Sequence, residues 1–329
     1  LWRTIVKTWV PRFQGACYDG ATMTNTTQTS ARGKRITDIF AAAADAGRPV
    51  VSFEIFPPRG ELSDEAAREV AGKLAPLGPD FISVTYSAGG SGTQGRAFNA
   101  TNQVSALIQD EFSRPTMAHL TCINATRASL EAACEDMRAL GIANVLALRG
   151  DITPNTVPGE FRYAKDIIGY LKDQGFCVGA AAYPEGHIDC DNPRVDIEHL
   201  KAKQDAGADF FITQLFFQNE LFYRFRERAQ AGGIEVPISC GVMPFMTKKQ
   251  VSRMVFMCGA SLPSPIVKLV ARYEDDRDAL QQAGCEYAAA QFADLEANGV
   301  DGLHLYTMNR PAVAESVMQR LNVLRAARG

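Results

Sequence analysis

The run NVLALRGD (144–151), followed by AKDIIGYLKDQG (164–175) and FCVGAAA (176–182), contains one complete strand–helix–strand unit. The two short apolar runs are typical of strands buried on both faces, and the stretch between them has the length and pattern of a helix. Gly175 follows the helical stretch directly, where a glycine commonly ends a helix. The unit therefore predicts two neighbouring parallel strands joined by a helix.

The same unit recurs along the chain, at intervals of about 30 residues for the first seven strands. The expected strands are Val50–Phe56, Phe81–Tyr86, Thr116–Cys122, Asn144–Arg149, Phe176–Ala182, Phe210–Leu215, Val236–Val242 and Val300–Tyr306. Helices are expected at Ser63–Leu77, Ala128–Leu140, Ala164–Gln174, Ile197–Ala206 and Asn219–Ala231, several of them ending at Gly78, Gly141, Gly175 and Gly207.

The gap before the eighth strand is about twice as long as the others and has room for extra helices around Lys248–Cys258 and Arg272–Asn298. Eight strand–helix units predict an α/β fold, a (β/α)8 TIM barrel with extra helices between strands 7 and 8. The competing architecture is a doubly wound open sheet.

The composition supports one large folded domain. Of 329 residues, 46% are hydrophobic and 22% are charged, which is enough to bury a large core. A net charge of −3 argues against a nucleic-acid partner. The sequence has no run of 18 apolar residues, so no membrane span is expected. Eight scattered cysteines without a C-x-x-C pair favour reduced thiols in a cytoplasmic protein.

Residues 1–35 differ from the rest, because they are basic, poor in acids and rich in threonine. Transit peptides share this composition. We expect instead a disordered or non-native extension, and a single catalytic domain over residues 36–329.

Two patterns invite a functional interpretation that we set aside. GSGTQG (90–95) matches the G-x-G-x-x-G dinucleotide fingerprint, but the next expected strand ends without the acid that would bind the ribose, which favours a flexible loop on the catalytic face. Cys190 lies near His187 and His199, a combination that suggests zinc. The spacing does not match known metal sites, so no metal site is expected.

Polar residues gather at the carboxyl ends of the expected strands, where a barrel places its catalytic groups. Glu54 stands out among them. Its neighbours in sequence are Phe53, Ile55 and Phe56, and apolar surroundings disfavour an ionised carboxylate, which suits a general acid near neutral pH. The alternative is a glutamate paired with Arg59 or another cation. His199 and Lys203 are one helical turn apart and can face one ligand.

Seven motifs then make the chain resemble the methylenetetrahydrofolate reductases of the short, bacterial type. They are SFEIFPPR (52–59), FISVTYSAGG (81–90), HLTCINAT (119–126), NVLALRGD (144–151), AAYPEGH (181–187), DAGADFFITQLFF (205–217) and LHLYTMNRP (303–311). The resemblance covers about residues 50–310. It implies a (β/α)8 barrel, a non-covalent FAD, NADH or NADPH as reductant, a folate substrate and a homo-oligomer.

The resemblance also implies site residues. Those matching the family's flavin contacts are Thr85, His119, Arg149, Gly150, Asp151, Tyr163, Tyr183, His187, Asp196, His199 and Lys203. Those matching its folate and nicotinamide contacts are Glu54, Asp151, Gln214, Gln250 and Arg310. Two positions depart from the family pattern, since Ala202 replaces a basic residue and Met254 replaces an aromatic one.

The activity implied is the reduction of 5,10-methylenetetrahydrofolate to 5-methyltetrahydrofolate, by two successive hydride transfers through the flavin. Glu54 would be the acid that protonates N10, and Asp151 would favour the cationic form of the substrate. Gln214 would bind the pterin. Two alternatives remain: another flavin-dependent barrel oxidoreductase, such as a proline dehydrogenase-like enzyme, or a non-catalytic folate- or flavin-binding partner subunit.

Overall fold

The computed structural model describes residues 31–57, 64–86, 94–152, 154 and 156–328. Eight parallel strands pair in chain order, and β8 pairs with β1 to close a barrel. They are β1 (Val50–Ile55), β2 (Phe81–Val84), β3 (Thr116–Thr121), β4 (Asn144–Leu148), β5 (Cys177–Ala182), β6 (Phe210–Thr213), β7 (Ile238–Val242) and β8 (Gly302–Tyr306). The predicted TIM barrel is confirmed, and closure excludes the open sheet.

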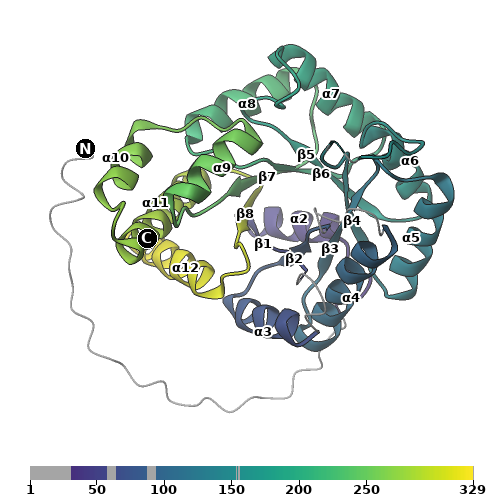
Figure 1. Ribbon diagram of the computed structural model, residues 1–329, viewed down its shortest axis with the longest axis horizontal. Helices are drawn as coiled ribbons and strands as arrows, with labels where there is room; N and C mark the ends of the chain where they lie inside the picture. The colour runs from purple at the N-terminus through teal and green to yellow at the C-terminus, as the bar shows by residue number, and fades with distance from the viewer. Residues whose placement is uncertain (1–30, 58–63, 87–93, 153, 155, 329) are drawn as a thin grey trace.

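Helices surround the strands (Figure 1). They are α2 (Ile36–Asp45), α3 (Asp64–Leu74) with the 3-10 turn η1 (Ala75–Leu77), α4 (Gln94–Phe112), α5 (Arg127–Ala139), α6 (Lys165–Asp173), α7 (Pro193–Asp205), α8 (Asn219–Ala231), α9 (Lys248–Cys258), α10 (Ser264–Arg272), α11 (Arg277–Ala297) and α12 (Pro311–Ala326). The predicted extra helices between β7 and β8 are present as α9 and α11, and α11 packs against α12. Helices α2, α4, α10 and α12 were not among those expected from the sequence.

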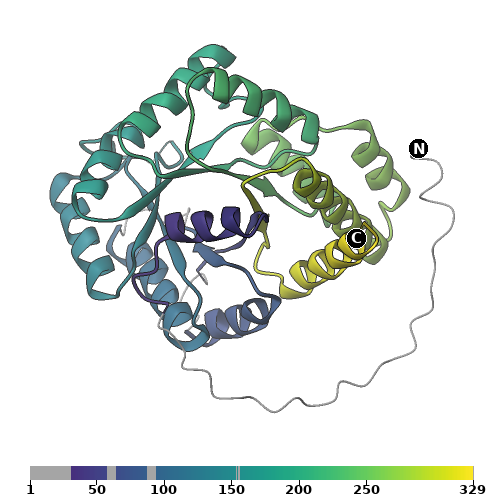
Figure 2. The same ribbon diagram turned by 180° about the vertical axis from the view of Figure 1, so that it is seen from behind.

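An apolar floor closes the amino-terminal end of the barrel. Viewed from behind, α2 lies across this end (Figure 2), and Phe40 packs against Phe210 with ring centroids 5.6 Å apart. Val50, Phe81 and Met117 belong to the same buried cluster, at or near the start of their strands. Because this end is filled with apolar side chains, polar chemistry inside the barrel is left to the carboxyl ends of the strands.

Glycines end the helices where the sequence predicts. Gly78, Gly141, Gly175 and Gly207 have φ angles of 77°, 70°, 88° and 108°, a left-handed conformation that residues with a Cβ rarely adopt. The chain therefore turns sharply after each helix and enters the next strand. This short return keeps the parallel strands in register around the barrel.

The amino-terminal extension is described only from residue 31. Residues 31–35 lie against the barrel: Ala31 is buried, Arg32 forms an ion pair with Asp110, and the Arg35 guanidinium donates a hydrogen bond to the Gly175 carbonyl oxygen. Most of the GSGTQG motif and Arg59 fall outside the described residues. Within the described part of the chain, no helix is long and apolar enough to span a membrane.

Candidate active site

A carboxylate and two imidazoles meet inside the barrel. Oε2 of Glu54 on β1 lies 3.5 Å from Nε2 of His304 on β8 and 3.7 Å from Nε2 of His119 on β3. Ser52 Oγ lies 2.8 Å from His304 Nδ1, and Ser83 Oγ lies 2.6 Å from His119 Nε2. We call these five residues the Glu54 cluster. The Glu54 side chain is 19% exposed while both imidazoles are buried, so the carboxylate is the group that a ligand can reach.

The surroundings of Glu54 differ from those expected. Phe53 and Ile55 are buried in the core outside the strands, because side chains alternate between the two faces of a strand. Glu54 faces the barrel interior, where its neighbours are imidazoles. The sequence expectation of an apolar environment is therefore wrong for the carboxylate itself.

The protonation state of His119 determines whether Glu54 has a positive charge beside it. Burial lowers the pKa of His119 to about 4, although the nearby Glu54 charge acts in the opposite direction. His119 is therefore neutral at pH 7 and does not hold Glu54 in an ion pair.

The loop after β8 fixes the end of β1. Thr307 donates two hydrogen bonds to the Glu54 carbonyl oxygen, from its N–H at 3.3 Å and its hydroxyl at 2.6 Å. The Asn309 amide bonds both sides of the Phe56 backbone, accepting from its N–H at 2.9 Å and donating to its carbonyl oxygen at 2.7 Å. Met308 and Asn309 have φ angles of 54° and 52°, a conformation uncommon outside glycine. The loop therefore holds the Glu54 backbone in a defined position.

Tyr306 forms a wall beside the Glu54 cluster. Its hydroxyl donates to the Thr213 carbonyl oxygen at 2.7 Å, and its ring meets the His304 ring edge-on at 5.0 Å between centroids. Burial and the Glu54 charge raise the pKa of Tyr306 well above its usual value, so it stays protonated. Gly241 makes room for this ring, because a Cβ there would lie 2.4 Å from the Thr213 oxygen and 2.7 Å from Tyr306 Cε2.

An arginine and a glycine follow β4 directly. Arg149 donates to the Asp189 carboxylate at 2.9 Å, which ties the end of β4 to the loop after β5. Gly150 has φ 91°, and a Cβ at this position would come within 3.1 Å of the Thr121 side chain. Asp151 comes next and is exposed, which leaves its carboxylate accessible to a ligand.

The loop after β5 and helix α7 bring four further predicted residues together. Tyr183 and His187 meet edge-on with ring centroids 4.7 Å apart, and Lys203 Nζ lies 5.3 Å from the centre of the Tyr183 ring. Lys203 donates to the Ala181 carbonyl oxygen at 2.7 Å, and burial lowers its pKa to about 8, opposed by the Asp196 charge. Burial raises the pKa of Asp196. Opposite charges here are partly desolvated and able to bind a polar ligand strongly.

The three remaining predicted folate contacts differ in their hydrogen bonds and exposure. The Gln214 amide oxygen accepts from the Leu215 N–H at 2.8 Å. The Gln250 amide oxygen accepts from the Met246 N–H at 2.9 Å, so it is engaged within its own loop at the start of α9. Arg310 is exposed at the start of α12. Their roles toward a substrate stay predictions.

The remaining predicted positions surround the same end of the barrel. Thr85 follows β2, and its N–H donates to the Ile55 carbonyl oxygen at 2.9 Å. Tyr163 is exposed before α6. Ala202 is half-buried on α7, and Met254 packs against the apolar cluster that includes α9 and α10.

His304, Ser52 and Ser83 are site residues that the sequence analysis missed. A signal was present, since Ser52 and Glu54 are two residues apart on one strand, as are His304 and Tyr306 on another. Residues two apart share a face of a strand, so each pair reaches the interior together.

Comparisons with known proteins agree on one family. A family profile for methylenetetrahydrofolate reductase matches residues 39–322. The 5,10-methylenetetrahydrofolate reductase of Salmonella typhimurium is 35% identical over 278 residues, covering 84% of this chain and 92% of that protein. A methylenetetrahydrofolate reductase (NADH) of Arabidopsis thaliana is 31% identical over 307 residues, covering 88% of this chain.

The chain spans about half the length of the fission yeast and Arabidopsis relatives, 46% and 51% respectively. Among solved structures, an uncharacterized Clostridium thermocellum protein that binds two copies of 5-methyl-5,6,7,8-tetrahydrofolic acid superposes with a TM-score of 0.61. It covers 87% of this chain and 99% of that chain at 14% identity, a likeness that concerns the fold alone.

Proposed function

The chain belongs to the methylenetetrahydrofolate reductase family, and we propose that it reduces 5,10-methylenetetrahydrofolate to 5-methyltetrahydrofolate with electrons from NADH or NADPH. The observation that carries this proposal is the Glu54 carboxylate, partly exposed above two buried imidazoles. The reaction opens a five-membered ring, and the departing N10 needs a proton. Glu54 would donate it.

The Glu54 cluster supports proton donation through three features. The carboxyl group is exposed on one side only, its His119 neighbour is neutral at pH 7, and its backbone is fixed by Thr307. His304 links Glu54 to Ser52 through its two ring nitrogens, at 3.5 and 2.8 Å. Because each ring nitrogen faces one partner, the Glu54 carboxyl and the imidazole are positioned relative to each other before substrate binds.

The residues on the β4–β5 side fit an FAD. A Cβ at Gly150 would crowd the Thr121 side chain at 3.1 Å, and Arg149, Lys203 and His187 supply polar groups on one side of the barrel mouth. These groups would hold the pyrophosphate and ribose, while Tyr183 presents a ring for packing. When bound, the FAD would carry a hydride from the nicotinamide to the folate.

The other polar residues would orient the substrate. Asp151 places negative charge at the barrel mouth, which favours a cationic folate over the neutral one. The Gln214 amide nitrogen would bind the pterin edge, while its amide oxygen accepts from the Leu215 N–H. A homo-oligomer remains a prediction of the family resemblance, and a cytoplasmic location remains a prediction from the scattered cysteines.

Glu54→Gln tests the function through its two half-reactions. We expect the folate step to slow by about 100-fold or more, the usual contribution of a general acid. Reduction of the flavin by NADH should remain near the wild-type rate, because hydride transfer to the flavin needs no acid at Glu54. Glu160→Gln removes an exposed rim carboxylate and serves as the matched control.

Stopped-flow absorbance of the flavin follows both steps. Equal loss of both half-reactions in Glu54→Gln would remove the acid role. A flavin that neither NADH nor NADPH bleaches would contradict the proposed reaction and favour the partner-subunit alternative. Asp151→Asn should mainly slow the folate step, and an unchanged folate rate would remove its electrostatic role.

A further inference from the structure

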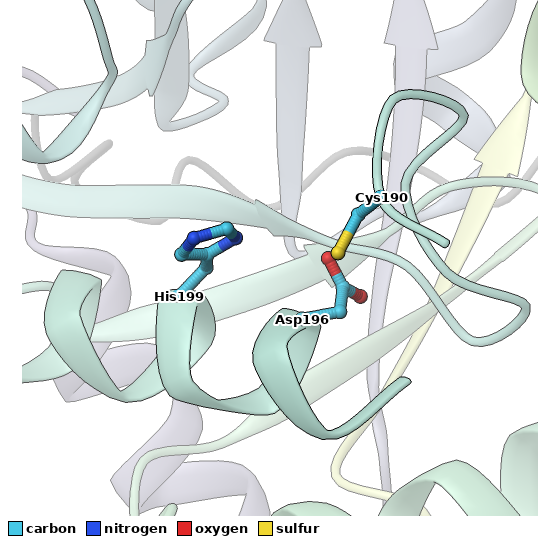
Figure 3. A group of neighbouring side chains, drawn as sticks. All are labelled: Cys190, Asp196 and His199. Carbon is cyan, nitrogen blue, oxygen red and sulfur yellow. The ribbon is translucent and has the colours of Figure 1, made fainter. Parts of the chain in front are cut away.

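Three metal-ligating side chains converge beside the β5–α7 loop. Cys190 Sγ, an Asp196 carboxylate oxygen and a His199 ring nitrogen all lie within 4.8 Å of one another. Figure 3 shows the Asp196 carboxylate turned toward the Cys190 sulfur, with His199 one turn farther along the same helix. Residues three apart on a helix share a face, so the two α7 residues approach from one side and the loop cysteine from the other.

The arrangement was not visible from sequence spacing. The sequence grouped Cys190 with His187 and His199, but the His187 Nδ1 accepts a hydrogen bond from the Asp189 N–H at 3.0 Å. The fold keeps His199 in the cluster and brings in Asp196 in place of His187. Asp196 is a buried carboxylate whose pKa is raised by burial. Cys190 is half-buried and His199 is exposed, which gives an ion a path from solvent.

The ligand set defines which ion fits. A thiolate, an imidazole and a carboxylate together favour Zn²⁺ and Co²⁺ over Mg²⁺ or Ca²⁺, which prefer oxygen ligands. Bond lengths of about 2.0 to 2.3 Å place tetrahedral ligand atoms roughly 3.5 Å apart. Movements of about 1 Å in the exposed His199 and the loop cysteine would therefore complete three bonds, which leaves a fourth position open to water.

We propose that Cys190, Asp196 and His199 form a binding site for Zn²⁺ or a chemically similar divalent ion, with the fourth ligand supplied by solvent. Binding releases the Cys190 thiol proton, because the thiolate is the ligand. The ion would bind Asp196 and His199, two residues that match flavin contacts of the family. Ion and flavin are therefore expected to compete, a consequence that rests on the proposed function.

The charge of Lys203 should weaken ion binding at this site. The Lys203 and Asp196 charges interact, so a cation bound at Asp196 would be repelled by the ammonium. Lys203→Met removes this repulsion and keeps a side chain of similar length. It should tighten ion binding, whereas removing a ligand should weaken it.

Cobalt(II) titration of the full chain, with and without FAD, tests the site. In the flavin-free chain we expect a thiolate-to-cobalt charge-transfer absorption and the strong visible bands of a four-coordinate ion. Cys190→Ser should lose the charge-transfer band, and His199→Gln should lose the four-coordinate visible bands. Cys258→Ser, which removes another half-buried cysteine, should keep both. Circular dichroism verifies that each variant is folded.

The outcomes separate the two proposals. No charge-transfer band in folded wild-type chain, or an equal band in Cys190→Ser, overturns the metal site. A band that FAD does not suppress refutes the competition, and a chain that binds cobalt but no FAD refutes the proposed function alone. As a second readout, Zn²⁺ should displace FAD from the loaded wild type, measured as a rise in flavin fluorescence. This displacement should need a lower Zn²⁺ concentration than in Cys190→Ser.

Discussion

Replacing His119 by glutamine should reduce the sensitivity of the fold to acid. The pKa of His119 is about 4 in the folded protein, against an ordinary value of 6.5. One tenfold change in proton affinity corresponds to 1.36 kcal/mol, so this difference is worth about 3 kcal/mol of folding free energy. Because the folded-state pKa is the lower one, the stabilisation is complete above about pH 6.5 and is lost as the pH falls toward about 4.

Glutamine can still hydrogen-bond to Ser83 but does not titrate in this range. The free energy of unfolding of wild type should fall by about 2 to 3 kcal/mol more than that of His119→Gln between pH 7 and pH 4.5. Urea denaturation at a series of pH values measures this difference. His187, whose pKa burial also lowers, titrates in both proteins and cancels in the comparison.

The diagnostic quantity is the dependence on pH and not the stability at one pH. Substitution in a packed interior lowers stability at every pH, and such an offset would leave the two curves parallel. Parallel curves would refute the reasoning, because they would mean that His119 binds its proton equally in folded and unfolded chains.

Two further predictions concern packing beside the site. Gly241→Ala should destabilise the fold by about 1 to 3 kcal/mol, since its Cβ would lie 2.4 Å from the Thr213 carbonyl oxygen, whereas Gly169→Ala in α6, with 3.7 Å to its nearest neighbour, should be neutral or stabilising. Equal denaturation midpoints for the two variants would contradict this. Asn309→Ala removes two hydrogen bonds to the Phe56 backbone, so urea denaturation should show a loss of about 2 kcal/mol in the free energy of unfolding. The same substitution should slow the folate step more than flavin reduction. Unchanged folate kinetics would exclude a positioning role for Asn309.

The barrel could be predicted from the sequence because its strands are buried on both faces. Each expected strand contains the observed one, and the ends differ by one or two residues at most positions. The apolar run and the glycine after each helix are local signals, and both survive in the fold. The order of the strands then follows from the connections, because each helix returns the chain to the neighbouring position.

Helix α4 was missed because the surface it buries mixes polar side chains with the apolar Val104, Ala106 and Ile108. Thr101, Asn102, Ser105 and Gln109 are all buried there. The Asn102 amide donates to the Asp136 carboxylate at 2.6 Å, and the Ser105 hydroxyl donates to the Thr101 carbonyl oxygen at 2.8 Å. Hydrophobic periodicity is weak in a helix whose inner face is partly polar.

The Glu54 cluster could be predicted only in part, for a different reason. The position of Glu54 at a strand end followed from the motif, but His304 lies 250 residues away along the chain. The two meet because β8 pairs with β1, placing Ser52 opposite His304 and Glu54 opposite Tyr306. A register between the first and last strands is a property of the closed barrel, and no local pattern encodes it.

The pairing of β8 with β1, which we call the β1–β8 seam, both completes the barrel and positions Glu54. The β8 strand and the loop after it supply His304, Thr307 and Asn309, which respectively contact the carboxylate, hold its backbone and brace the end of β1. The same contacts complete the barrel. Substitutions that loosen the β1–β8 seam should for this reason lower stability and proton donation together, whereas substitutions on the β4–β5 side should affect flavin binding with little change at Glu54. The separation follows from the geometry, because the two sides of the barrel mouth are built from different strands.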